Sequence, residues 1–116
     1  KVKDISENIE VYSIVGRNLE HSRVFYFEND GDHKIYLSSA DLMPRNLDRR
    51  IEVMFPIEEE DLKEEVFKVL ELNLSDNTKK RIQESDGTYK NSNARSSKKI
   101  NAQKELYKLA KKKSSI

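Results

Sequence analysis

Residues 23–38 read Arg-Val-Phe-Tyr-Phe-Glu-Asn-Asp-Gly-Asp-His-Lys-Ile-Tyr-Leu-Ser. The aromatic and β-branched residues of 23–28 are typical of a strand, and 33–38 has the same character. Residues 29–32, Asn-Asp-Gly-Asp, have the chemistry of a tight turn. The stretch therefore predicts a β-hairpin over residues 23–38.

On the N-terminal side of the hairpin, residues 9–15 alternate apolar and polar side chains and then end apolar. This pattern predicts a strand that enters a buried sheet. Gly16 interrupts the pattern, and residues 17–22 are expected to form a short helix or turn.

On the C-terminal side, Pro44 disfavours helical geometry at the residue before it. We therefore expect an ordered loop or a single turn over residues 39–49. Residues 51–55, Ile-Glu-Val-Met-Phe, alternate as a strand that stops at Pro56.

Residues 58–74 predict the longest helix. Acidic side chains at 58–61 favour the positive end of the helix dipole, and apolar side chains follow at helical spacing. The acidic run 58–65 could also be a cation site, but its place at a helix start makes dipole complementarity the better interpretation. The apolar stripe consists of Leu62, Val66, Val69, Leu70 and Leu74.

The last part of the chain is polar and basic. We expect a turn at residues 85–87, a mobile stretch at 91–99 and a final helix over 102–113. Residues 1–90 carry 14 basic and 20 acidic side chains, whereas residues 91–116 carry 8 basic and 1 acidic. The basic tail suits phosphates or an acidic partner, or it is a solvated terminal helix; both interpretations stay open.

Composition excludes several classes of site. The 116 residues suit one domain. They include no cysteine, which removes disulfides, zinc–thiolate sites and thiol nucleophiles. Three widely spaced glycines exclude the glycine-rich nucleotide loops. No apolar run approaches the roughly 20 residues of a membrane span.

Two histidines remain as candidates for chemistry. His33 lies at the predicted turn and is expected to be exposed to solvent. His21 precedes the aromatic strand and has Arg17 and Arg23 nearby, which suits an anion pocket. A purely structural role for His21 stays open.

Three arginines fall within six residues, at Arg45, Arg49 and Arg50. Guanidinium groups bind phosphate oxygens in a bidentate way. The same arginines could instead form ion pairs with Asp41, Asp48 or Glu52, and the sequence does not decide between the two.

At these residues the chain resembles the C-terminal domain of bacterial polyphosphate kinases. The likeness rests on several ordered motifs at consistent spacing and covers nearly the whole chain. The segments that carry it are 13–17, 19–23, 36–41, 44–50, 52–53, 74–77 and 101–103.

The resemblance implies an α/β or α+β fold of the phospholipase D type, with a mixed β-sheet flanked by helices. The chain looks like most of the second such domain: residues 1–74 would form an incomplete core and 75–116 a polar extension ending in a basic helix. The motifs 21–23 and 38–41 resemble degenerate forms of that fold's catalytic motifs. The residues at which these motifs differ from the catalytic ones favour a domain that holds phosphate chains rather than one that cleaves phosphodiesters. Because the sequence starts without methionine, we expect a fragment.

The resemblance also implies an activity. Polyphosphate kinases reversibly transfer the terminal phosphate of ATP to polyphosphate through a phosphohistidine, which would lie outside this chain. His21 would bind phosphate and act as a proton donor or acceptor. Arg50, Arg49 and Arg45 would neutralise phosphates. The supporting residues would be Ser39, Asp41 and Asn46, with Asp41 orienting His21.

The implied partners are ATP, ADP, polyphosphate and the remaining domains of a homo-oligomeric enzyme. Magnesium would enter with ATP, mainly through the other domains, and no metal ligand is assigned to this chain. We expect a cytoplasmic location, with membrane association left open, no nucleic acid partner, and no activity from the isolated fragment. The alternative is a non-catalytic phosphate- or nucleic-acid-binding module driven by the basic tail.

Overall fold

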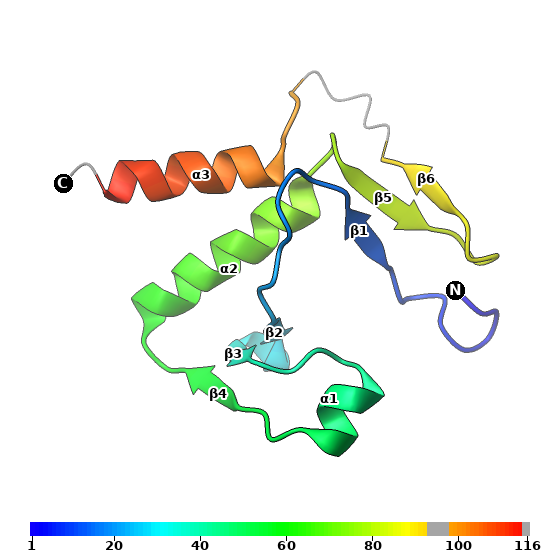
Figure 1. The fold of residues 1–116 in the computed structure, drawn as a ribbon, viewed down its shortest axis with the longest axis horizontal. Helices are drawn as coiled ribbons and strands as arrows, with labels where there is room; N and C mark the ends of the chain where they lie inside the picture. Colours follow the sequence, from blue (N-terminus) through cyan, green and yellow to red (C-terminus); the bar gives the residue numbers. More distant parts are fainter. Residues whose placement is uncertain (93–97, 115–116) are drawn as a thin grey trace. The chain divides into compact units, whose positions relative to one another are not determined.

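The computed structural model describes residues 1–92 and 98–114, drawn as a ribbon in Figure 1. It divides into two compact units, which we call the central unit (residues 20–70) and the terminal unit (residues 1–19 with 71–116). The elements are β1 (Tyr12–Ile14), β2 (Val24–Phe27), η1 (Asn29–Gly31), β3 (Lys34–Ser38), α1 (Pro44–Arg49), β4 (Met54–Ile57), α2 (Glu60–Ser75), β5 (Lys80–Gln83), β6 (Tyr89–Asn91) and α3 (Ala102–Lys113).

The predicted hairpin is confirmed and forms the middle of the central unit. β2 and β3 pair antiparallel, with Tyr26 opposite Ile35. The turn between them is the short 3₁₀ segment η1, in which Asn29, Asp30 and Gly31 all have positive φ. Asparagine, aspartate and glycine tolerate this left-handed conformation better than other residues, which is why this tetrapeptide reverses the chain.

The segment after the hairpin differs from its prediction in two places. Residues 44–49 form the helix α1, where a loop or single turn was expected. Met43 is extended, as predicted, but Pro44 then occupies the first helical position, where its missing N–H is not needed. β4 covers Met54–Ile57, so Pro56 lies inside the strand instead of ending it. β4 is an edge strand of the β2-β3-β4 sheet, and an edge position accommodates proline.

The predicted long helix is confirmed as α2, and it covers part of the central sheet. The rings of Phe67 on α2 and Tyr26 on β2 lie 5.0 Å apart between centroids. Ile35 of β3 is the most buried apolar side chain of this unit, with 2% of its surface exposed. The core of the central unit is therefore small and built between one sheet and one helix.

The terminal unit contains two strands that the sequence did not predict. β1, which confirms the predicted first strand, pairs with β5, and β5 pairs with β6, all antiparallel. The predicted turn at 85–87 is confirmed: Gly87 has a φ of 84° and the N–H of Glu84 donates to the carbonyl of Thr88 at 2.8 Å. β5 and β6 carry few apolar residues, so their periodicity is weak.

The α+β class is thus confirmed, but the sheets differ from the single mixed sheet that the resemblance implied. The described strands form two three-stranded antiparallel sheets. Short connections join β2 to β3 and β5 to β6, and a short connection between neighbouring strands permits only antiparallel pairing. The division at residues 74 and 75 stays a prediction; β1 and β5, which pair, come from its two parts.

The second half of the terminal unit is fastened by one buried carboxylate. Asp76 follows α2 and is 0% exposed. Its Oδ1 accepts from the backbone N–H groups of Thr78 (2.8 Å), Lys79 (2.7 Å) and Lys80 (3.2 Å), and its Oδ2 accepts from that of Ala102 at 2.7 Å. Asp76 therefore joins the end of α2, the start of β5 and the start of α3.

α3 confirms the predicted helix over 102–113, and its first turn binds the chain after β1. The side chain of Gln103 accepts from the N–H groups of Arg17 (3.0 Å) and Asn18 (3.2 Å) and donates to the carbonyl of Asn18 at 2.7 Å. A Cβ at Gly16 would lie 2.4 Å from the Gln103 amide oxygen, so this approach needs glycine. Of the predicted mobile stretch 91–99, residues 93–97 lie outside the described residues.

Candidate functional site

The candidate site is a short chain of polar contacts at one end of the β2–β3 pair. Nη2 of Arg23 lies 2.8 Å from Nε2 of His21, and Nε of Arg23 donates to Oδ1 of Asp41 at 2.8 Å. Because the N–H of Ser38 donates to the carbonyl of Arg23, the start of β2 lies beside the end of β3. That pairing brings Asp41 within reach of Arg23.

The contact with Arg23 determines which ring nitrogen of neutral His21 carries the proton. A guanidinium group only donates hydrogen bonds, so Nε2 of His21 is the acceptor. A neutral imidazole carries one proton, and in this arrangement it sits on Nδ1. His21 therefore has Nδ1–H as its donor toward an incoming ligand.

Asp41 stays ionised beside the guanidinium group of Arg23. The hydrogen bond from Arg23 lowers the pKa of Asp41 below its ordinary value; burial opposes this effect, and the nearby positive charges of Arg23 and Arg45 lower the pKa further. The same hydrogen bond raises the pKa of Arg23. Asp41 thus orients Arg23 directly, and through the hydrogen bonds of Arg23 it helps to orient the His21 ring.

Arg23 was noted from the sequence as a cation near His21, but no role of its own was assigned to it. The resemblance placed Asp41 next to His21, whereas the structure inserts the arginine between them. A signal was present, since residues two apart in an extended segment point to the same side. His21 and Arg23 have that spacing.

The predicted supporting residues Ser39 and Asn46 form a second group, organised by Glu52. The Ser39 hydroxyl donates to Oε2 of Glu52, and Nδ2 of Asn46 donates to Oε1 at 3.1 Å. The N–H of Val53 donates to the Ser39 hydroxyl at 3.0 Å. Asn46 is 2% exposed. These contacts hold α1 against the approach to β4, so both residues support the loop from within.

The three candidate arginines are left without carboxylate partners in the part of the chain that the structure describes. Glu52 is occupied by Ser39 and Asn46, and Asp41 forms its ion pair with Arg23. Within residues 1–92 and 98–114, the three arginines therefore form no ion pair with these carboxylates or with Asp48. Of the three, Arg45 is close enough for its charge to act on Asp41; within the described residues none of them forms a hydrogen bond with His21.

A cavity of ≈ 320 Å³ adjoins His21. α2 contributes Val66 and Val69 to its wall, and Arg23 and Ser38 contribute polar atoms. His21 thus lies at a cavity with an apolar wall and with one guanidinium group, that of Arg23, on its polar side. The remaining lining residues are Ser22, Val24 and Leu37.

Two other kinds of site are absent from the described residues. No three His, Cys, Asp or Glu side chains gather there in a way that could hold a metal ion. No helix within residues 1–92 and 98–114 has the length and apolar character that crossing a membrane requires.

Comparison with known proteins places this geometry in a family. The family model described as polyphosphate kinase C-terminal domain 2 matches residues 1–103. A polyphosphate kinase of Bacillus cereus is 48% identical over 109 residues, which is 94% of this chain and 16% of that protein. One of Staphylococcus haemolyticus is 53% identical over 88 residues, 76% of this chain and 12% of that protein.

A solved structure agrees with the sequence comparison. The crystal structure of polyphosphate kinase from Porphyromonas gingivalis matches with a TM-score of 0.87 and 37% identity, covering 93% of this chain and 17% of that one. The chain therefore spans about a sixth of the relatives it matches. Because the family model matches most of the chain, this chain belongs to the polyphosphate kinase family, as its C-terminal domain 2.

Proposed function

We propose that this chain is the part of a polyphosphate kinase that holds the phosphates of ATP and polyphosphate while the terminal phosphate is transferred. The observation that carries the proposal is the arrangement around His21: a ring oriented by Arg23, beside a segment whose arginines 45, 49 and 50 have no ion pair among the described residues. Unpaired guanidinium groups are suited to phosphate oxygens.

Phosphoryl transfer depends mainly on positioning and on stabilising charge. Nδ1–H of His21 donates a hydrogen bond to a phosphate oxygen and so helps to position it. Arg45, Arg49 and Arg50 neutralise the phosphate chain, while Asp41 keeps Arg23, and through it the His21 ring, in place. The phosphohistidine that receives the phosphate lies outside this chain in our proposal.

Magnesium is the cofactor that the family implies with ATP, where it neutralises the phosphates. Among the described residues no trio of metal-ligating side chains gathers, so these residues do not fit a dedicated metal site. The proposal routes no step through the metal and assigns its ligands, the homo-oligomeric contacts and the phosphohistidine to the remaining domains.

An NMR titration of the 116-residue chain with tripolyphosphate tests the proposal. The chain has only two histidines, so both imidazoles can be assigned. We expect the resonances of His21 to shift and saturate while those of His33 stay in place. Arg50→Ala should weaken this binding roughly tenfold, because it removes a charge-assisted hydrogen bond; Arg49→Ala and Arg45→Ala rank the other two arginines.

The control separates this site from the basic tail. A triple Lys111→Gln, Lys112→Gln, Lys113→Gln variant removes three charges from the end of α3 without touching its first turn. If this variant loses more affinity than Arg50→Ala, binding is driven by the tail, and the alternative of a non-catalytic phosphate- or nucleic-acid-binding module replaces our proposal.

A further inference from the structure

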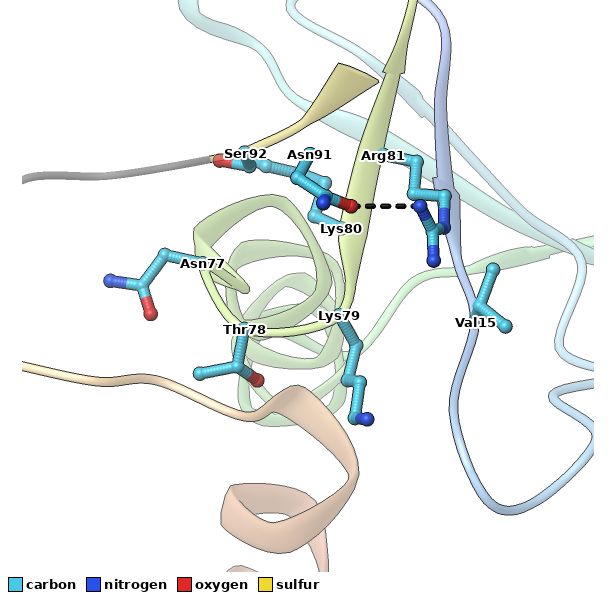
Figure 2. Close-up of a pocket in the computed structure, with 8 residues that line it drawn as sticks. All are labelled: Val15, Asn77, Thr78, Lys79, Lys80, Arg81, Asn91 and Ser92. Carbon is cyan, nitrogen blue, oxygen red and sulfur yellow. Dashed lines mark hydrogen bonds between the residues drawn. The ribbon is translucent and has the colours of Figure 1, made fainter. Parts of the chain in front are cut away.

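A second hollow lies in the terminal unit, beside the start of β5. Its volume is ≈ 350 Å³, at the lower end of the roughly 300–1,000 Å³ of small-ligand pockets. Figure 2 shows its lining side chains. They come from the segment after β1, the stretch from α2 into β5, and the end of β6. The lining residues are Val15, Asn77, Thr78, Lys79, Lys80, Arg81, Asn91 and Ser92.

Two of the three consecutive cations at this hollow are left for a ligand. Lys80 is committed elsewhere, since its ammonium donates to the carbonyl of Leu74 at 2.5 Å and lies 4.6 Å from the ring centroid of Tyr12. Lys79 and Arg81 form no ion pair with any residue in the described ranges 1–92 and 98–114. Both line the hollow.

Arg81 is held in place by a neutral group. Its Nη1 donates to Oδ1 of Asn91 at 2.8 Å, a pair that crosses from β5 to β6, where the two residues are opposite each other. An amide orients the guanidinium without neutralising it, so its other N–H groups and its full charge stay open to an anion. The dashed line in Figure 2 marks this contact.

The rest of the lining suits a phosphate chain. None of the eight residues is acidic, and none is aromatic. Thr78 and Ser92 add hydroxyl groups, which can donate to phosphate oxygens. Asp76 is near in sequence, but its carboxylate is fully buried and already accepts backbone N–H groups. The whole terminal unit carries 15 basic and 8 acidic side chains, net +7.

We propose that this hollow is a second phosphate-binding site, built from a different unit than the His21 site, and that Lys79 and Arg81 bind a segment of an inorganic phosphate chain there. The identification of the chain as polyphosphate rests on the proposed function, whereas the anion site rests on its own residues. The absence of aromatic lining residues favours an inorganic chain over a nucleic acid, whose bases bind by stacking.

The test uses the 116-residue chain and tripolyphosphate, followed through backbone amide resonances. We expect the amides of Thr78, Lys79 and Arg81 to shift and saturate. Lys79→Gln and Arg81→Gln should each weaken this response roughly tenfold, and Gln at 81 keeps a donor for Asn91. The control Lys104→Gln, Lys112→Gln removes two charges from α3, outside the lining, and should change it less than about twofold.

The possible outcomes separate this site from the one at His21. A response of the pocket amides that Lys79→Gln and Arg81→Gln weaken supports the second site, whether or not the His21 ring responds. Equal losses in the α3 control variant mean diffuse attraction and overturn it, as does an unresponsive pocket. ATP should bind there no more tightly than tripolyphosphate. Tighter binding of a single-stranded oligothymidylate of equal charge would assign the hollow to nucleic acid instead.

Discussion

The Nε2 atoms of His21 and His33 face neighbours of opposite charge. Nε2 of His21 faces the guanidinium of Arg23 and must accept. Nε2 of His33 lies 3.3 Å from a carboxylate oxygen of Glu28, an ion-pair contact that favours a proton on that nitrogen. The local partner thus selects a different ring tautomer at each position, and it leaves only His21 with a free Nδ1–H donor.

We therefore expect neutral His21 to carry its proton on Nδ1 and neutral His33 to carry it on Nε2. Nitrogen–proton correlation spectra of the two imidazoles, recorded above the pH at which they protonate, report this directly. Arg23→Leu should move His21 toward the Nε2–H form that free imidazole side chains favour, and should leave His33 unchanged. If His21 has the same tautomer with and without Arg23, the guanidinium does not orient the ring.

At the scale of elements, Asp76 connects three of them through one carboxylate. Burial by itself raises the pKa of Asp76, but the hydrogen bonds from the N–H groups of Lys79, Ala102, Thr78 and Lys80 outweigh it, and the pKa lies below its ordinary value. The ionised form is therefore favoured by folding. The start of α3 depends on a residue 26 positions away in sequence.

Asp76→Asn should destabilise the chain by about 1–3 kcal/mol. Asparagine can keep the three bonds to one oxygen, but its amide N–H₂ then faces the N–H of Ala102, and two donors do not pair. Urea unfolding measured by circular dichroism gives the difference. Asp86→Asn is the matched control, because Asp86 is exposed and accepts from the N–H and hydroxyl of Thr88, and an asparagine oxygen can accept those bonds.

The pH dependence of the same variant has a defined sign. Because the folded pKa of Asp76 is lowered, its contribution is complete above the unfolded pKa of about 3.9 and is lost as the pH falls below it. The gap in stability between the parent chain and Asp76→Asn should thus shrink below about pH 4. A gap that widens on acidification contradicts the role of the ionised carboxylate.

At the scale of the whole molecule, the two units carry opposite charge. The central unit has 7 basic and 13 acidic side chains, net −6, and the terminal unit is net +7. The near-neutral total therefore conceals two different surfaces. Many large apolar side chains are also exposed, including Leu19 (90%) and Ile51 (102%), in a chain that spans about a sixth of its relatives.

The isolated chain should bind phosphate chains but make no polyphosphate from ATP, because the proposed phosphohistidine lies in another domain. The check is an assay for acid-insoluble phosphate with the purified 116-residue chain, run beside a full-length polyphosphate kinase as the positive control. Robust ATP-dependent chain growth by the 116-residue chain would show that the transferring group lies within it.

The sequence by itself determined the elements whose signal is local. The hairpin around η1 follows from turn chemistry between two apolar strands, and α2 and α3 follow from helical periodicity. The family resemblance also followed from short ordered motifs, and the family comparison confirms it. Each of these depends on residues within a few positions of one another, and so each can be read along the chain.

Only the tertiary structure decided the features that join distant residues. β5 and β6 are polar segments that become strands by pairing with β1 and with each other. Arg23 comes between His21 and Asp41 because β2 and β3 lie side by side. Asp76 accepts a hydrogen bond from the first residue of α3. Lys79 and Arg81 line one hollow with Val15 and Ser92. Backbone hydrogen bonds and burial set these neighbours, and no local pattern of side chains encodes which distant partner satisfies them.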